Sequence, residues 1–267
     1  MLDLAITGSG PAALAAAIYA GRSGLKTAVF EKDKLGGTLT EIAKIENYPG
    51  FIGTGTELAE ILKKQVALAG VEIKYGACES INPLIIDGEE VETKAILVAT
   101  GSEPRTLDFD PKIPVSYCVL CDAPLYKGKK VAVIGGGNSA VQESLHLAKL
   151  VDSVTIFTHS KLKAEPYLIE KISKLENIEI KENIEATAEN LKDFAAVFVF
   201  IGKRPATSFL SKNILSEDGH IITENHQTTI PNLFAAGDVR EGSIKQAITS
   251  AADGVEAVIE IMNYLKH

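Results

Sequence analysis

Two glycine-rich turns constrain the fold of this 267-residue chain more than any other feature of its sequence. The first has the sequence GSGPAA at residues 8–13 and follows the apolar residues 2–7. The second has the sequence GGGNSA at residues 135–140 and follows residues 130–134. In both, glycines permit a tight turn from a strand into a helix, and the backbone can then approach a pyrophosphate at the helix amino terminus. Two such turns predict an α/β fold with parallel sheets.

The remaining sequence alternates strands with helices, as an α/β fold requires. We expect strands at residues 2–7, 27–30, 71–75 and 95–100 and helices at residues 11–23 and 56–69. Residues 103–114 hold three prolines and are typical of a linker. After it we expect strands at residues 130–134, 154–157 and 195–201 and helices at residues 139–150 and 243–265. The pattern starts twice, so we predict two Rossmann-like units.

The first turn carries the full set of residues that a dinucleotide site needs. Gly8 permits the turn, Gly10 lets the backbone approach the pyrophosphate, and the small Ala13 keeps helix and strand close. Glu31 ends the next strand, near the offset of about 20 residues at which an acid binds ribose hydroxyls. These residues predict a dinucleotide site rather than a plain tight turn.

The second turn lacks such an acid. Thr158, at the matching offset from Gly135, is neither the acid that selects NAD nor the arginine that selects a 2′-phosphate. One interpretation is a Rossmann-like unit that binds its nucleotide weakly or not at all. The other is a weak NAD(P)H site in which Lys161 and Lys163 hold a 2′-phosphate as point charges. Its residues would be Gly135, Gly137, Asn138, Ser139, Ala140, His159, Lys161 and Lys163.

Cys118 and Cys121 form a CxxC pair, and Asp122 follows it. Side chains three residues apart in a helical turn lie on one face, with about 5–6 Å between their Cβ atoms. A small closure brings two such cysteines within the range of a disulfide. A helix amino terminus would favour the thiolate of one cysteine, and Asp122 can move the proton that thiol exchange needs. The pair therefore predicts a redox-active dithiol.

A half zinc site is the structural alternative for this pair. A structural zinc needs four ligands, and the chain has no second CxxC, so we expect no metal. Cys78 stands alone after a predicted strand and has the character of a packed small hydrophobe.

Composition excludes several classes of protein. A formal net charge of -8 argues against a nucleic-acid partner, because phosphates repel an acidic surface. No run of about 18 apolar residues is present, so we expect no membrane partner. Three cysteines do not make an extracellular disulfide framework, and the first residues have no signal-peptide pattern. We therefore expect a cytoplasmic protein.

The order of these motifs resembles that of the low-molecular-weight thioredoxin reductases over nearly the whole chain. After GSGPAA come Glu31, the glycine pair at 36–37, ENYPG at 46–50 and ATG at 99–101. The CxxCD motif stands before GGGNSA, and near the end FAAGD at 234–238 precedes KQAIT at 245–249. The resemblance implies an FAD-dependent pyridine nucleotide-disulfide oxidoreductase. Its expected domains are an FAD-binding domain at 1–107 and 205–267 and an inserted NAD(P)H-type domain with the CxxC at 108–204.

The resemblance also implies roles for single residues at the flavin. The turn at residues 8–13 would hold the FAD pyrophosphate, Glu31 the adenosine ribose, and Asp238 the ribityl or pyrophosphate portion. The expected FAD-binding residues are Gly8, Gly10, Pro11, Ala12, Glu31, Lys32, Gly36, Gly37, Thr38, Leu39, Asn47, Cys78, Ala99, Thr100, Gly101, Gly237, Asp238, Lys245, Gln246 and Ala247.

At the dithiol, the same resemblance implies that Cys121 exchanges electrons with the flavin. Cys118 would attack the disulfide of the partner, and Asp122 would be the acid beside them. It further implies a homodimer and a thioredoxin-like or glutaredoxin-like partner.

The chain departs from that family at the second turn. The family's His-Arg-Arg-x-x-x-Arg set, which binds the 2′-phosphate of NADPH, is replaced by Thr158, His159, Ser160 and Ala164. Losing several charge-assisted hydrogen bonds, at about 1.5–3 kcal/mol each, weakens binding by orders of magnitude. We therefore expect weak or absent NADPH use.

Some thioredoxin-reductase-like proteins without the arginines do not use NADPH and accept electrons from another donor, such as a ferredoxin. Lys127, Lys129 and Lys130 form either a basic docking patch for it or a solvated turn. Two other functions stay open. A ferredoxin–NADP reductase-like flavoprotein has this fold, but its relatives lack the dithiol. A flavin-containing redox sensor is compatible with a second turn that lacks the side chains for binding a nucleotide.

Overall fold

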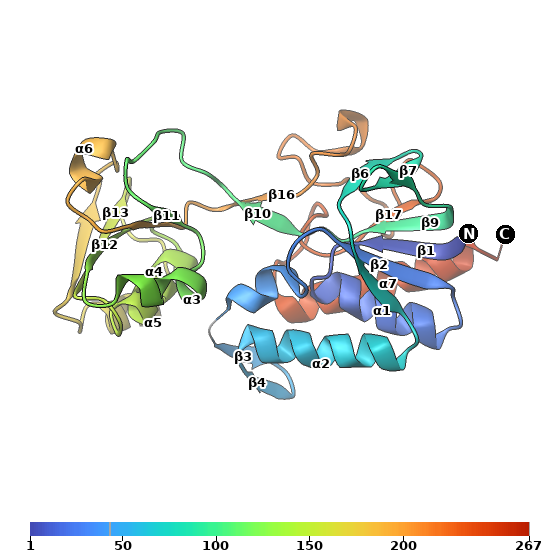
Figure 1. Ribbon diagram of the computed structural model, residues 1–267, viewed down its shortest axis with the longest axis horizontal. Coiled ribbons are helices and arrows are strands. Elements are labelled where there is room, and N and C mark those ends of the chain that lie inside the picture. The colour runs from blue at the N-terminus through green and yellow to red at the C-terminus, as the bar shows by residue number, and fades with distance from the viewer. Residues whose placement is uncertain (43, 267) are drawn as a thin grey trace. The chain divides into compact units, whose positions relative to one another are not determined.

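Two units are formed by the residues that the computed structural model describes, 1–42 and 44–266. The first unit combines Met1–Glu103 with the chain from Arg204 onward, and the second is the segment between them, Pro104–Lys203. Each unit is built on a five-stranded parallel sheet (Figure 1). The predicted α/β fold with two Rossmann-like units is therefore confirmed.

The sheet of the first unit has the strand order β17-β9-β1-β2-β5. Its strands are β1 (Leu2–Thr7), β2 (Thr27–Glu31), β5 (Glu72–Tyr75), β9 (Thr93–Val98) and β17 (Leu233–Ala235). All neighbouring strands run parallel. The carboxyl ends of β1, β2, β9 and β17 therefore meet at one edge of the sheet, which is where nucleotides bind in open α/β sheets.

Alternate residues of β1 point to opposite faces of this sheet. Leu4 and Ile6 join a core with α1 (Pro11–Arg22), α2 (Gly55–Leu68) and α7 (Ala247–Tyr264). Ala5 instead joins a core that includes residues of the antiparallel sheet β6-β7-β8. The bounds of these three strands are Cys78–Ile81, Leu84–Ile86 and Glu89–Glu90. Figure 1 shows the helices on one face and β6 and β7 on the other.

Smaller elements of the first unit lie close to the expected flavin segments. The single-turn helix η1 (Gly37–Glu41) and the hairpin of β3 (Ile45–Tyr48) and β4 (Phe51–Gly53) follow β2. A second single-turn helix, η3 (Lys212–Ile214), precedes β17. The last helix begins at Ala247 and not at residue 243 as predicted, because Lys245 has a φ of 55°, which a right-handed helix does not allow.

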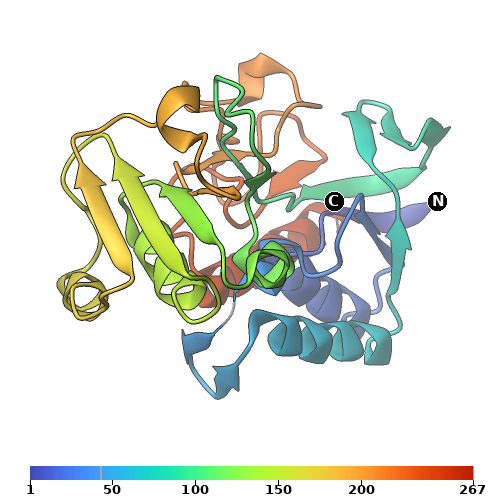
Figure 2. The ribbon, with the colours of Figure 1, turned by 60° about the vertical axis from the view of Figure 1, so that its left-hand side comes forward.

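The second unit repeats the arrangement with the strand order β11-β15-β12-β13-β14. Its strands are β11 (Val115–Ser116), β12 (Lys130–Ile134), β13 (Ser153–Thr158), β14 (Ile178–Glu182) and β15 (Val197–Val199). One face packs on α3 (Val119–Asp122), η2 (Ala123–Tyr126), α4 (Asn138–Leu147) and α5 (Pro166–Ile172), and the other on α6 (Ala188–Leu191). Figure 2 shows the same sheet from another side. The apolar run 195–201 contributes only the three residues of β15 to the sheet.

Two adjacent segments connect the units. β10 (Ser102–Pro104) and β16 (Lys203–Pro205) form a two-stranded sheet, and Arg204 Nε lies 2.8 Å from Glu103 Oε1. The predicted linker at 103–114 therefore begins with the end of a strand. Within the described ranges, no helix is both long enough and apolar enough to cross a membrane.

Candidate functional site

The GSGPAA turn joins β1 to α1, and at Gly8 it passes too close to the end of β9 for a side chain to fit. Gly8 has a φ of 95°, and a Cβ there would lie 2.4 Å from the carbonyl oxygen of Ala99 at the end of β9. Gly10 precedes α1, and among the described residues no side chain caps this helix. A Cβ on Gly10 would meet no described atom within 4 Å. The amide groups of the first turn of α1 therefore have room for an anion such as a pyrophosphate.

Glu31 is fixed at the end of β2 by two hydrogen bonds. The Ser9 hydroxyl donates to Oε2 at 2.6 Å, and the Asp33 amide donates to Oε1 at 3.0 Å. Ser9 in turn accepts from the Gly36 amide at 2.9 Å. The side chains of Ser9 and Glu31 are both buried. Ser9 is not among the site residues predicted from the sequence, although a hydroxyl between the two glycines of the turn is a visible signal.

Several expected FAD residues from distant segments meet around this turn. A Cβ on Gly37 would lie 3.7 Å from Gly10, and one on Gly237 would lie 2.8 Å from the Ala12 Cβ. The loop after β2 and the turn after β17 therefore both contact the start of α1. Three other expected residues have different surroundings. Leu39 is buried in the helix-side core, Lys32 is exposed, and the Thr100 hydroxyl donates to the carbonyl of Ala206.

Asp238 is held in place by α7. The Ser250 hydroxyl donates to Asp238 Oδ1 at 2.7 Å. Asp253, which lies further along this helix, accepts the Gly237 amide through Oδ2 at 2.7 Å, and Arg240 Nη2 donates to its Oδ1 at 2.6 Å. Ser250 and Asp253 therefore orient the turn that carries Asp238. The sequence offered no local signal for them, because the contacts depend on how α7 packs.

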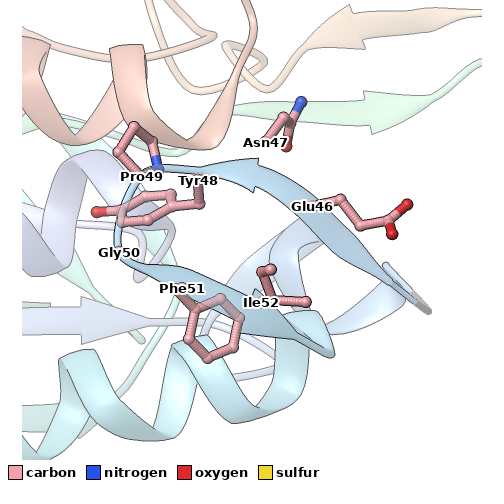
Figure 3. A pocket seen from close by; sticks show the side chains of 7 residues that line it. All are labelled: Glu46, Asn47, Tyr48, Pro49, Gly50, Phe51 and Ile52. Carbon is pink, nitrogen blue, oxygen red and sulfur yellow. The ribbon is translucent and has the colours of Figure 1, made fainter.

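The β3–β4 hairpin meets the segment before α7. Asn47 Nδ2 donates to Gln246 Oε1 at 3.1 Å, which brings two of the expected flavin residues together. The hairpin lines a hollow of about 590 Å³ with residues 46–52, shown in Figure 3. Tyr48 lies at this hollow, and burial raises the pKa of its hydroxyl.

Cys78 lies on β6 and packs against the core on the sheet face opposite α1. Its thiol donates to the carbonyl of Ser80 at 3.5 Å. Burial raises the pKa of this thiol to about 11. The packed environment matches that of a small hydrophobe, and the FAD contact expected of Cys78 stays a prediction.

In the second unit, Cys118 and Cys121 form a disulfide with 5.3 Å between their Cα atoms. Cys118 is the residue before α3, and its Sγ accepts the Cys121 amide at 3.2 Å. Cys118 is half-buried and Cys121 is exposed. In this oxidised form neither sulfur is a thiolate, and the pair has the chemistry of disulfide exchange.

Ser116 connects the dithiol to Asp122. Its buried hydroxyl donates to Asp122 Oδ2 at 2.7 Å and accepts the Cys118 amide at 3.2 Å. One side chain therefore orients both the acid and the backbone of the first cysteine. Ser116 is not among the site residues predicted from the sequence, although a serine two residues before a turn often bonds to the backbone of that turn.

The GGGNSA turn repeats the close approach of the first turn. A Cβ on Gly135 would lie 2.3 Å from the carbonyl oxygen of Phe200, and one on Gly136 would lie 2.4 Å from the Thr158 hydroxyl. Thr158 is thus buried under the turn. His159, Lys161 and Lys163 are exposed in the following loop.

Two Rossmann-like units, a turn that suits a dinucleotide and a CxxC disulfide together define the class of flavin-dependent disulfide oxidoreductases. The pyridine nucleotide-disulphide oxidoreductase family matches residues 2–254. The chain belongs to this family.

Its relatives include thioredoxin reductases. The one from Borreliella burgdorferi is 36% identical over 301 residues, which cover 99% of this chain and 92% of that protein. The crystal structure of the Lactococcus lactis thioredoxin reductase has a TM-score of 0.91 at 33% identity and covers 100% of this chain and 99% of that one. A ferredoxin-flavin thioredoxin reductase from Clostridium acetobutylicum has a TM-score of 0.57 at 30% identity, covering 99% and 97%.

Family membership confirms two expectations from the sequence. The chain is a flavoenzyme that uses FAD, and its reaction class is disulfide oxidoreduction. The first unit fits this cofactor, because the start of α1 offers uncapped amides and open space beside Gly10.

The raised pKa of Cys78 predicts slow alkylation. With a pKa of about 11, roughly one thiol in a thousand is ionised at pH 8, against about a quarter for an ordinary cysteine. With the disulfide intact, we expect iodoacetamide to label Cys78 about two hundredfold more slowly than an exposed cysteine, and the rate to rise about tenfold per pH unit up to pH 10. Mass spectrometry of labelled protein measures this, with Cys78→Ser as the control. Rapid labelling at pH 8 would contradict the burial.

The bond from Ser116 to Asp122 predicts a slower dithiol in Ser116→Ala. A hydrogen bond to a charged group contributes about 1.5–3 kcal/mol, so we expect the reduced enzyme to react with a small aromatic disulfide at least about tenfold more slowly. Stopped-flow absorbance measures the rate. Ser116→Thr, which keeps the hydroxyl, should restore it, and the flavin spectrum should not change. An unaltered rate in Ser116→Ala would show that this bond does not position Asp122 for exchange.

Proposed function

We propose that this protein reduces the disulfide of a thioredoxin-like or glutaredoxin-like protein through Cys118 and Cys121, with weak or absent use of NADPH. The observation that carries the proposal is the Cys118–Cys121 disulfide with Asp122 tied to it through Ser116. When FAD is bound, it supplies the two-electron chemistry that returns this disulfide to the dithiol. By resemblance, Cys121 is the residue that faces the flavin.

The reduced pair then transfers its electrons by two thiol exchanges. The Cys118 thiolate attacks the partner's disulfide, so that the partner's S–S bond breaks and a mixed disulfide forms. The Cys121 thiolate attacks Cys118 Sγ, which re-forms the Cys118–Cys121 disulfide and releases the partner as a dithiol. The partner gains two electrons and two protons, which the pair loses. Asp122 is positioned to move one of these protons.

The FAD contacts belong to the same proposal. Gly8, Gly10 and Ala12 would hold the pyrophosphate at the start of α1, and Glu31, oriented by Ser9, would accept the ribose hydroxyls. Four more of the expected residues meet this turn: Gly36, Gly37, Ala99 and Gly237. Asp238 follows Gly237 and is oriented by Ser250. The assignment of the first unit to FAD and of the second to a nicotinamide nucleotide rests on the resemblance.

Weak NADPH use is supported by the side chains of the second unit. Arg105 is the only arginine between residues 104 and 203, and it belongs to the connection, where its Nε donates to the Lys203 carbonyl. Lys161 and Lys163 are the cations near the GGGNSA turn, and both are exposed. Exposed lysines bind a phosphate more weakly than a set of arginine forks does.

A reduced ferredoxin is the donor that we propose instead. The similar structure from Clostridium acetobutylicum is named as a ferredoxin-flavin enzyme. Lys127, Lys129 and Lys130 are exposed in the segment that runs from η2 to the first residue of β12. They would offer an acidic ferredoxin a basic patch on a chain of net negative charge. We also infer a cytoplasmic homodimer, since a reducing compartment suits a catalytic dithiol and the resembling family is dimeric.

The donor is tested by anaerobic reduction of the flavin. We expect reduced ferredoxin to bleach the flavin absorbance and NADPH or NADH at micromolar concentration to leave it unchanged. Dithionite should bleach every sample and so shows that the flavin is competent. Bleaching by micromolar NADPH would overturn the weak-site part of the proposal.

The dithiol is tested by serine substitution. We expect Cys121→Ser and Cys118→Ser each to lose reduction of a thioredoxin-like disulfide while retaining bound flavin, measured by insulin turbidity with a supplied thioredoxin and by the flavin spectrum. Glu176→Gln, which changes an exposed residue of the same unit, is the control and should retain the wild-type rate. If Cys121→Ser reduced the partner as fast as the wild type does, the relay through the pair would be wrong. If the wild type itself reduced no partner, a redox sensor without turnover would be favoured instead.

A further inference from the structure

The loop between β13 and α5, residues 159–165, is tied to the GGGNSA turn. The Lys163 amide donates to the carbonyl of Gly136 at 2.7 Å. Glu165 and Asn138 bond to each other twice: the Glu165 amide donates to Asn138 Oδ1 at 2.8 Å, and Asn138 Nδ2 donates to Glu165 Oε1 at 3.1 Å. We refer to these two bonds as the Asn138–Glu165 clasp.

The clasp places a carboxylate at the amino end of α4. Asn138 is the first residue of this ten-residue helix, and no side chain of the described residues caps it. A negative group near a helix amino terminus is favoured by the unpaired amides there, and it is the position where such turns hold a pyrophosphate. A nucleotide diphosphate held at the start of α4 would therefore lie near the negative charge of Glu165 and be repelled by it.

A second carboxylate supports the loop from the neighbouring strand. Glu182, the last residue of β14, accepts the Leu162 amide at 2.9 Å through Oε1. Both carboxylates lie at the carboxyl edge of the sheet, where an open α/β sheet binds its ligand. This edge is thus negative at two points, although Lys161 and Lys163 lie in the same loop.

Steric hindrance at the turn does not explain weak binding. A Cβ on Gly137 would meet no described atom within 4 Å, which is also true of Gly10 in the first unit. The backbone at both turns is therefore equally open to a diphosphate. Besides lacking the arginines, the second turn has the Glu165 carboxylate held next to the first residue of its helix by the clasp.

We propose that Glu165 is a specificity-determining residue that keeps diphosphate nucleotides out of the second unit by charge. The proposal rests on the weak nucleotide use described under the proposed function and adds a cause beyond the missing arginines. The side chain is exposed and hydrogen-bonded only at the surface, so it can be neutralised without removing packing.

The test is the affinity of the FAD-loaded enzyme for NADP⁺, measured by isothermal titration calorimetry. Glu165→Gln removes the charge and keeps an oxygen that can accept from Asn138. We expect it to bind NADP⁺ at least about tenfold more tightly than the wild type, because one repulsive charge next to the diphosphate is lost. The gain should shrink as salt is added, which a purely structural change would not do.

Glu176→Gln is the matched control, since it removes an exposed glutamate of the same unit and should leave the affinity unchanged. Glu165→Ala removes both the charge and the side-chain bond to Asn138, whereas Glu165→Gln removes the charge and can keep that bond. Comparing the two variants therefore separates the effect of the charge from that of the clasp. If Glu165→Ala opened the site and Glu165→Gln did not, or if neither changed a weak wild-type affinity, the charge mechanism would be wrong while the proposed function stood. Micromolar binding of NADP⁺ by the wild type would instead overturn the weak-site part of the proposed function together with this inference.

Discussion

The first unit depends on close contact between the backbone at the start of α1 and segments from both ends of the chain. A Cβ at Gly8 would lie 2.4 Å from the Ala99 carbonyl oxygen, and one at Gly254 would lie 2.1 Å from that of Ala12. Only glycine permits both approaches. Because β17 and α7 belong to the last part of the chain, residues 1–103 do not complete this core, and the GSGPAA turn takes its shape from residues far away in the sequence.

The second unit has the same close backbone approach at its glycine-rich turn, but different side chains surround it. Gly135 approaches the Phe200 carbonyl as Gly8 approaches that of Ala99. Around the first turn, Ser9 fixes Glu31 at the end of β2. Around the second, Thr158 is buried at the matching strand end. The fold alone therefore does not decide which nucleotide each unit accepts, and the difference lies in a few polar residues on the same frame.

The sequence predicted the features that local chemistry determines. The two turns, Glu31 at its strand end and the CxxC pair follow from residue type and spacing. Ser9, Ser250 and Asp253 could not be found in the same way, because their hydrogen bonds join residues that only packing brings together, and serine or aspartate is common on any surface. The start of α7 was misplaced for a related reason. The apolar and polar pattern continues through residues 243–246, but the backbone at Lys245 is left-handed.

The paired strands that connect the units have a consequence for how such a chain can be rearranged. The Arg105 amide donates to the Gly202 carbonyl, and the Ala206 amide donates to the Gly101 carbonyl, so the chain leaves one unit and returns to it through neighbouring strands. Adjacent strands lie about 4.8 Å apart, a gap that a hairpin turn of two residues spans. Residues 104–203 therefore form a cassette whose removal or replacement need not disturb the register of the surrounding sheet.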